Sequence, residues 1–155
     1  MNKPLHDVDF LRWTIAQAAA LRRAGTMSIN TPDPIDWEDV AEEIEALGRS
    51  ERAALRSRIA VILEHLFKLA LSPSRAPRRG WLRTLDTQRD AIRRLLDDSP
   101  SLRGEVAVLV TEELHHARKA LTRSAARYAE PLPIDPASIA FSAEQVLDED
   151  YPPVP

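Results

Sequence analysis

Apolar residues recur at helical spacing along most of the chain, and no segment of useful length alternates apolar and polar residues as a strand would. The longest such pattern runs from Asp36 to Leu71. At 100° per residue its apolar positions fall on one side of a helix both before and after Gly48. The spacing therefore predicts one very long helix, continuous or kinked at Gly48, although Gly48 could also end one helix before Ser50 caps another. The apolar stripe consists of Trp37, Val40, Ala41, Ile44, Leu47, Leu55, Ile59, Ile62, Leu66 and Leu69.

Three further long helices are predicted by the same spacing. One covers about residues 7–24 and is ended by Gly25, and another covers about residues 81–96. The last begins where Ser99 can act as a cap and Pro100 can take the first helical position, and it continues to about Ala129. Turn residues predict a loop in "NTPDPID", and Ser72-Pro73 is expected to end the very long helix.

The last part of the chain, residues 131–155, reads as a loop, a short helix and an extended tail. Ser142 is expected to begin the short helix, with Gln145 three residues later completing a capping box. The predicted fold is therefore all-α: a bundle of four main helices plus a short C-terminal helix, forming a single domain over residues 1–155.

Composition narrows the class of protein. The 155 residues are enough for an ordinary domain, and the absence of cysteine excludes disulfides and thiol chemistry. The N-terminus lacks the layout of a secretory signal. The most apolar run, Ile59–Leu71, is too short for a membrane span and contains Glu64, His65 and Lys68. We expect a soluble cytoplasmic protein with no membrane contact.

Charge is unevenly distributed, although the net charge is only −3. From Asp36 to Glu51 the chain has seven acidic residues against one arginine, and from Arg75 to Arg94 it has seven arginines against two aspartates. These segments could be ordinary solvated faces, or they could attract each other within a chain or between chains. We expect the partner to be a second copy, forming a homodimer, or another protein. Nucleic acid could bind only through the Arg75–Arg94 segment.

Three polar residues, Glu51, Arg58 and His65, lie seven apart on the apolar side of the very long helix. Steps of seven residues are about 10.5 Å, so each of them needs a partner from another helix or from water. One hypothesis is a buried, satisfied polar network that fixes helix register, and we call it the polar seam. Its inward partners would be Gln88 and Glu113, with His116 at the edge, so that the seam consists of Glu51, Arg58, His65, Gln88, Glu113 and His116.

A metal-binding helical bundle is one alternative. The letters "EELHH" contain Glu-x-x-His twice, as Glu112/His115 and Glu113/His116, and this spacing places two ligands on one side of a helix. A single ion held by Glu51, His65, Glu113 and His116 can be imagined. A di-iron bundle, however, needs such motifs on two helices, so the sequence predicts neither a metal nor a cofactor.

A ribonuclease is the other alternative, with Arg58 and His65 as catalytic residues. Their spacing is similar to the Arg-x(4–6)-His of small helical HEPN ribonucleases. A histidine can move a proton near neutral pH, and an arginine can stabilise the charge that develops on phosphorus. Such spacings are expected about 1.4 times by chance in a chain of this composition, so the motif carries little weight.

The segments "DWEDVAEEIEALGRSERAALRSRIAVILEHLFKLAL" and "RRGWLRTLDTQRDAIRRLLDDSPSL" resemble the bacterial family called domain of unknown function 29. The resemblance extends from Phe10 to about Tyr151. It implies a small all-helical protein and no particular activity, because the family has no established one. The expected function is therefore a non-enzymatic protein-interaction or oligomerising module, with the ribonuclease and the metal-binding bundle as alternatives.

Overall fold

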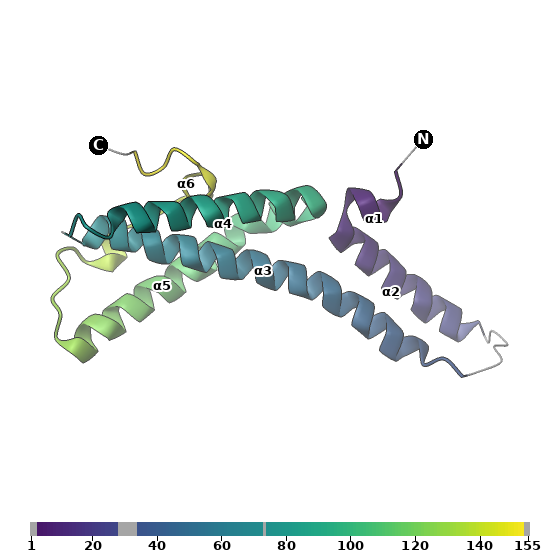
Figure 1. The fold of residues 1–155 in the computed structure, drawn as a ribbon. Coiled ribbons are helices and arrows are strands. Elements are labelled where there is room, and N and C mark those ends of the chain that lie inside the picture. The colour runs from purple at the N-terminus through teal and green to yellow at the C-terminus, as the bar shows by residue number, and fades with distance from the viewer. Residues whose placement is uncertain (1–2, 28–33, 73, 154–155) are drawn as a thin grey trace. The chain divides into compact units, whose positions relative to one another are not determined.

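The structure is a computed structural model that describes residues 3–27, 34–72 and 74–153. All regular structure in these ranges is helical (Figure 1), which confirms the all-α prediction with four long helices. No helix in the described ranges is long and apolar enough to cross a membrane. The predicted loop "NTPDPID" and the helix end at Ser72-Pro73 lie partly outside these ranges. The elements are α1 (Leu5–Val8), α2 (Phe10–Thr26), α3 (Trp37–Leu71), α4 (Arg78–Asp98), η1 (Pro100–Glu105), α5 (Val106–Tyr128), η2 (Pro136–Ser138) and α6 (Ala143–Leu147).

Two compact units make up the chain. Residues 1–54 with 94–103 form one, which we call the hairpin unit, and residues 55–93 with 104–155 form the other, which we call the bundle unit. Helix α3 contributes its residues 37–54 to the hairpin unit and its residues 55–71 to the bundle unit. The behaviour of residues 1–155 as a single domain stays a prediction.

Helix α3 runs for 35 residues without a break, so the alternative in which Gly48 ends a helix is wrong. The structure gives Gly48 a different role, as the place where α2 comes closest. A Cβ atom added at Gly48 would lie 2.5 Å from Thr14 Oγ1 and 2.9 Å from Leu11 Cδ1. Glycine is therefore required here by the neighbouring helix, and the backbone remains helical.

In the hairpin unit, α2 and residues 37–54 of α3 run antiparallel (Figure 1). Gly25 near the end of α2 lies against Trp37 at the start of α3, and a Cβ at Gly25 would be 2.8 Å from Trp37 Cβ. One turn earlier, Arg22 donates to Glu45 at 2.6 Å and to Glu38 at 2.8 Å. The hydrogen bond from Arg22 holds the pKa of Glu45 below its ordinary value, and the two carboxylates hold the pKa of Arg22 above its usual range.

Asp9 divides the helix that was predicted over residues 7–24. Its extended backbone ends α1, and its Oδ1 accepts from the Arg12 N–H as the N-cap of α2. The same carboxylate accepts from the Ser101 N–H and hydroxyl, each at 2.9 Å, while the Ser99 hydroxyl accepts from the Leu11 N–H. Ser99 was expected to cap the helix that follows it. Its hydroxyl instead serves α2, and the chain passes through the 3₁₀ turn η1 before α5 begins.

Two residues of the predicted apolar stripe, Val40 and Leu47, are exposed by 41% and 46%. Their expected burial is wrong, because α2 covers only the side of α3 that carries Ala41 and Gly48. A continuous apolar stripe therefore does not imply continuous burial along α3.

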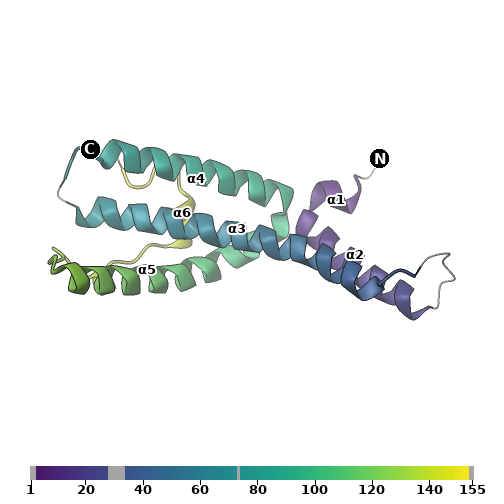
Figure 2. The ribbon, with the colours of Figure 1, turned by 60° about the horizontal axis from the view of Figure 1, so that its bottom comes forward.

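In the bundle unit, α3 lies between α4 and α5 (Figure 2). Leu63 and Phe67, which lie off the main stripe, are fully buried, so the wide apolar circumference of this part of α3 is used inside the unit. Burying an aliphatic or aromatic side chain contributes about 1.5–3 kcal/mol. The largest fully buried side chains here are Leu55, Ile59, Ile62, Leu63, Leu66, Phe67, Leu85, Ile92, Leu109 and Val146.

Two arginines hold the C-terminal segment to the bundle unit. Arg89, only 4% exposed, donates to the carbonyls of Val146 and Gln145, and burial lowers the pKa of its guanidinium. Arg118 likewise donates to the carbonyl oxygens of Pro136 and Ile139. The predicted start of α6 is confirmed, because the Ser142–Gln145 capping box is present with both of its hydrogen bonds.

Candidate functional site

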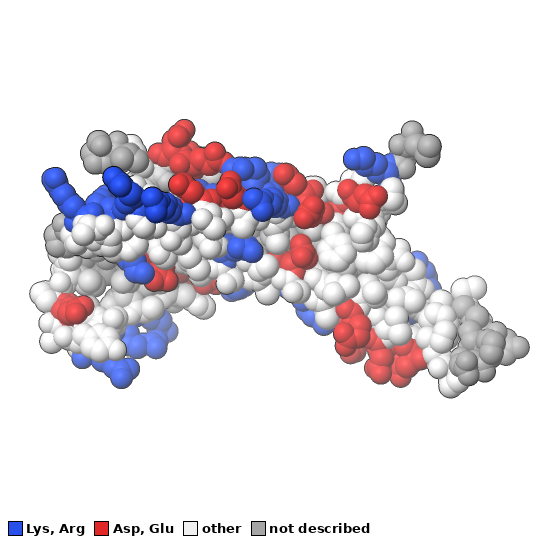
Figure 3. Space-filling view, viewed as in Figure 1, with Lys and Arg blue, Asp and Glu red and all other residues white. Residues whose placement is uncertain are grey.

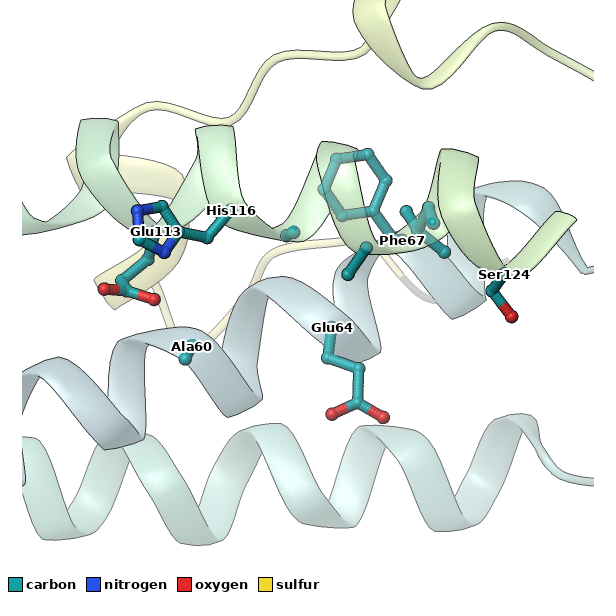
Figure 4. A pocket seen from close by; sticks show the side chains of 9 residues that line it. Ala60, Glu64, Phe67, Glu113, His116 and Ser124 are labelled. Atoms are coloured by element: carbon teal, nitrogen blue, oxygen red, sulfur yellow. The ribbon is translucent and has the colours of Figure 1, made fainter. Parts of the chain in front are cut away.

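A groove between α3 and α5 in the bundle unit is the main concave surface that we consider as a site (Figure 4). Its volume is about 390 Å³. Along α3 the lining residues follow i, i+4, i+7 spacing, and along α5 they span twelve residues, so the groove follows both helices for two to three turns. The lining residues are Ala60, Glu64, Phe67, Glu113, His116, Ala117, Ala120, Leu121 and Ser124.

The sequence of α5 explains why the space is left open. Its first half buries large residues, Leu109, Val110 and Leu114, against the core. Further along, three of the α5 positions that line the groove are small, namely Ala117, Ala120 and Ser124, while Leu121 is the large apolar residue among them. Small side chains cannot fill the distance between two helices, so a hollow remains above the buried ring of Phe67. That ring is fixed from behind by edge-to-face packing on Phe141, with the ring centroids 5.2 Å apart.

Glu113 and His116, which lie one turn apart on α5, are the polar residues at one end of the groove (Figure 4). Glu113 is buried, and its Oε1 accepts from Arg56 Nη1 at 3.0 Å. The other terminal nitrogen of Arg56 donates to Glu112 at 2.7 Å. One arginine thus bridges two neighbouring carboxylates, and the charge of Glu113 is compensated where it is buried.

The rim along α3 is formed by Glu64, which is exposed and pairs with Lys68 one turn later at 2.5 Å. In Figure 4 its carboxylate points away from α5. The walls of the groove are therefore mainly apolar, and the charged groups that line it are already paired within the chain. Such a surface suits an apolar partner better than a charged small molecule.

The polar seam is only partly assembled. Arg58 donates to Gln88 Oε1 at 3.2 Å, which joins α3 to α4. The Nε of Arg58 is buried and has no hydrogen-bond partner among the described residues. A buried donor without a partner costs about 1–3 kcal/mol of folding free energy, so the Nε of Arg58 lowers the stability of the bundle unit.

His65 finds its partner on its own helix. Its Nδ1 donates to the Val61 carbonyl at 2.8 Å, one turn earlier on α3. The expectation that His65 needs a partner from another helix or from water is therefore wrong. The local bond is possible because a side chain four residues after a carbonyl lies above it on the same face.

His116 is exposed, so its expected place at the edge of a buried seam is wrong. The residue faces the groove mouth instead, because α5 and α3 do not close over it. Glu51 belongs to the hairpin unit and is half-buried there. Burial, and then the negative charge of Asp98, raise the pKa of the Glu51 carboxyl above its ordinary value.

Neither chemical alternative gains a site from this geometry. Within residues 3–27, 34–72 and 74–153, no three His, Asp or Glu side chains come together in a way that could hold a metal ion. Glu113, proposed as a ligand, is bound to Arg56. Arg58 and His65, the candidate nuclease pair, are separated by about 10.5 Å of helix rise and are each engaged elsewhere, by Gln88 and Val61.

Sequence reasoning missed both the groove and Arg56. The groove is signalled in the sequence by the change from large to small residues along the inner side of α5. The contact of Arg56 with Glu112 and Glu113 has no local signal, because it depends on the level at which α3 and α5 pack.

Comparisons with known proteins agree with the all-helical fold. The model of a family described as "Domain of unknown function DUF29" matches residues 5–152. The chain is also similar to an alpha-helical protein of unknown function from Rhodospirillum rubrum, a crystal structure at 1.45 Å resolution. The identity is 25% and the TM-score 0.69, and the match covers 97% of this chain and 93% of the other. No curated protein matches the chain.

Proposed function

The chain belongs to the family described as domain of unknown function DUF29, and because that description assigns no activity we propose a function from the geometry of the groove. We propose that the protein is a non-enzymatic interaction module whose α3–α5 groove receives an amphipathic helix of a partner protein. The observation that carries this proposal is the open, mainly apolar groove between two helices of the bundle unit.

The shape of the groove favours a helix as its occupant. Its lining residues repeat at i, i+3, i+4 and i+7 along two flanking helices, which is the complement of the pattern that a docked amphipathic helix presents. Ala60, Ala117 and Ala120 allow the backbone of a third helix to come close. A helix laid there would lie above the already buried Phe67 and cover the exposed small residues of α5, and would complete a packed layer on that side of α3.

The charges of the groove support a polypeptide with an apolar face. Glu113 and Glu64 are neutralised by Arg56 and Lys68, so neither is available for a cationic ligand. His116 remains exposed at one end and can hydrogen-bond a polar residue of the docked helix.

Site-specific photocrosslinking tests the proposal. A photoreactive amino acid is placed at Ala120, which lines the groove, and as a control at its exposed neighbour Lys119, which does not. The full-length protein is irradiated in its native host cells, and the attached peptide is sequenced by mass spectrometry. We expect Ala120, and not Lys119, to capture a peptide with apolar residues at helical spacing.

Filling the groove provides the matched control. Ala117→Leu places extra volume in the groove and should abolish the crosslink, whereas Ala126→Leu, at an exposed position of α5 outside the lining, should leave it unchanged. Equal capture at Ala120 and Lys119, capture that persists in Ala117→Leu, or a captured peptide without an apolar helical face would overturn the proposal. So would a small apolar molecule found in the groove by native mass spectrometry.

A further inference from the structure

A row of arginines at the start of α4 has no partner within the described chain. Arg79 and Arg83 lie four residues apart at the start of α4 and share one side of the helix, and Arg75 lies in the bend that precedes it. All three are exposed, and their guanidinium groups make no hydrogen bond or ion pair with any described residue. We call them the basic face. In Figure 3, Lys and Arg side chains gather over this part of α4.

Arg78, Arg89 and Arg93 of the same helix are already engaged, whereas Arg94 is exposed near the far end of the helix. Arg78 donates to the Leu69 carbonyl at 2.9 Å, and Arg93 pairs with Asp90 and Glu149. The positive charge without a partner is therefore concentrated at the beginning of α4. The positive end of the helix dipole lies there as well and adds to the attraction for negative groups.

A second helix face with unsatisfied groups lies at the start of α3. Asp36, Val40, Glu43 and Leu47 follow i, i+4, i+7, i+11 spacing, so two acidic and two apolar residues share one stripe, which we call the acidic face. All four are exposed, and the side chain of Glu43 has no partner among the described residues. Figure 3 shows Asp and Glu side chains gathered over this end of α3.

We infer that two copies of this chain form a dimer in which the acidic face of each copy packs on the basic face of the other. Charge complementarity is the main argument, because both segments keep exposed charges that have no ion-pair partner among the described residues: Asp39, Glu42 and Glu43 in the acidic segment, and Arg75, Arg79 and Arg83 in the basic one.

The charged and the apolar residues of the two faces contribute differently to binding. Exposed ion pairs add little affinity, but they steer association and set the register of the partner. Val40 and Leu47 supply the apolar area that the charges lack, since each is exposed by more than two fifths in the single chain. Nucleic acid fits this arrangement less well, because the acidic segment would repel a phosphate backbone and the net charge of the chain is negative.

Charge reversal with rescue tests the inference, and sedimentation velocity over a range of concentrations is the measurement. Arg79→Glu/Arg83→Glu reverses the basic face. Asp39→Arg/Glu43→Arg reverses Glu43 of the acidic face and its exposed neighbour Asp39, and leaves the helix-capping Asp36 in place. Each double variant alone should weaken the dimer by about tenfold or more. Circular dichroism checks that both variants keep the helical content of the parent.

An equimolar mixture of the two double variants is the decisive sample. In the mixed dimer both contacts again join opposite charges, so the mixture should associate with nearly the affinity of the parent. Lys119→Glu/Arg123→Glu, an equal charge reversal at exposed positions of α5, should leave the dimer unchanged. Raising the ionic strength from about 0.05 to 0.5 M should weaken the parent dimer, because exposed charges are screened.

The opposite results would overturn the inference. They are a parent chain that is monomeric at every concentration, a mixture that does not regain the association lost in the separate variants, or a basic face whose reversal abolishes RNA binding by a monomeric protein. This inference concerns surfaces other than the groove and goes beyond the proposed function. Ala117→Leu should not change the dimer, and the charge reversals should not change the crosslink at Ala120, so the two proposals fail separately.

Discussion

The two parts of α3 have the same apolar spacing and very different surroundings. Residues 37–54 bury small residues, Ala41 and Gly48, and leave Val40 and Leu47 exposed. Residues 55–71 bury almost every large apolar side chain they have, including Leu63 and Phe67. The difference shows that burial along a helix depends on how many neighbours cover it: α2 for the first part, and both α4 and α5 for the second.

The same comparison distinguishes the bundle unit, which has an extensive apolar core, from the hairpin unit, which leaves apolar side chains of α3 exposed. In the bundle unit, nearly the whole apolar face of α3 is buried, and Arg89 and Arg118 hold the C-terminal segment through its carbonyl oxygens. In the hairpin unit, polar contacts join the segments: Asp9 binds Ser101, and Arg22 binds Glu45 of α3.

The largest expected effect distinguishes the two parts with one type of substitution. Leu63→Ala should lower the free energy of unfolding by about 2–5 kcal/mol, because it leaves a cavity in a fully buried site. Leu47→Ala, on the same helix but 46% exposed, should change it by less than about 1 kcal/mol. Urea denaturation at low protein concentration measures both. Equal losses for the two variants would contradict the comparison.

The next largest effect comes from two glycine-to-alanine substitutions, which should change the stability of the protein in opposite directions. Gly48→Ala should destabilise the protein by about 1–3 kcal/mol, because its Cβ would meet Thr14 and Leu11 below van der Waals distance. Gly80→Ala in α4 should stabilise it by about 0.5–1 kcal/mol, because nothing lies within 4 Å of the new Cβ and alanine favours a helix. Thermal unfolding measures the two shifts.

A second substitution, at Thr14, tests whether the clash with the new Cβ causes the loss in Gly48→Ala. Thr14→Ala removes the Oγ1 atom that lies nearest to the new Cβ, so it should recover part of the stability lost in Gly48→Ala. If Gly48→Ala were as stable as Gly80→Ala, the close approach of α2 to α3 would be wrong.

His65→Leu should have a small effect, below about 1 kcal/mol, although His65 is half-buried in the bundle unit. The substitution removes only a hydrogen bond to the Val61 carbonyl, which keeps its backbone donor within α3, so no buried group is left without a partner. Urea denaturation with circular dichroism measures the change. A loss above about 2 kcal/mol would mean that His65 binds a group on another helix.

The smallest effect is a pH dependence in the hairpin unit. The folded state raises the pKa of Glu51, so it favours the protonated form, and stability falls as the pH rises through that raised pKa. Glu51→Gln should therefore raise the midpoint of thermal unfolding at pH 7 by about 1–2 °C, and the gain should vanish below the ordinary pKa of glutamate. Asp98→Asn should act in the same direction at pH 7. A Glu51→Gln variant less stable than the parent at pH 7 would contradict this assignment.

The fold was largely predictable from the chain because helical spacing is a local property. The four long helices, the uninterrupted α3 and the Ser142–Gln145 capping box follow from residues near one another in sequence. The break at Asp9 was missed, because the Asp9 carboxylate is held by Ser101, which is distant in sequence. Within the polar seam, the Arg58–Gln88 contact joins two predicted inward residues, whereas His65 and His116 have other surroundings than expected.

The sequence by itself determined which residues are helical, which side of each helix is apolar, and where opposite charges are concentrated, since all three are set by residues within a few positions of one another. Only the tertiary structure decided that Gly48 is a contact with α2, that Arg56 bridges Glu112 and Glu113, and that small residues of α5 leave a groove above Phe67. These features depend on the level and distance at which helices pack. Packing depends on side chains far apart in the chain, which no local pattern records.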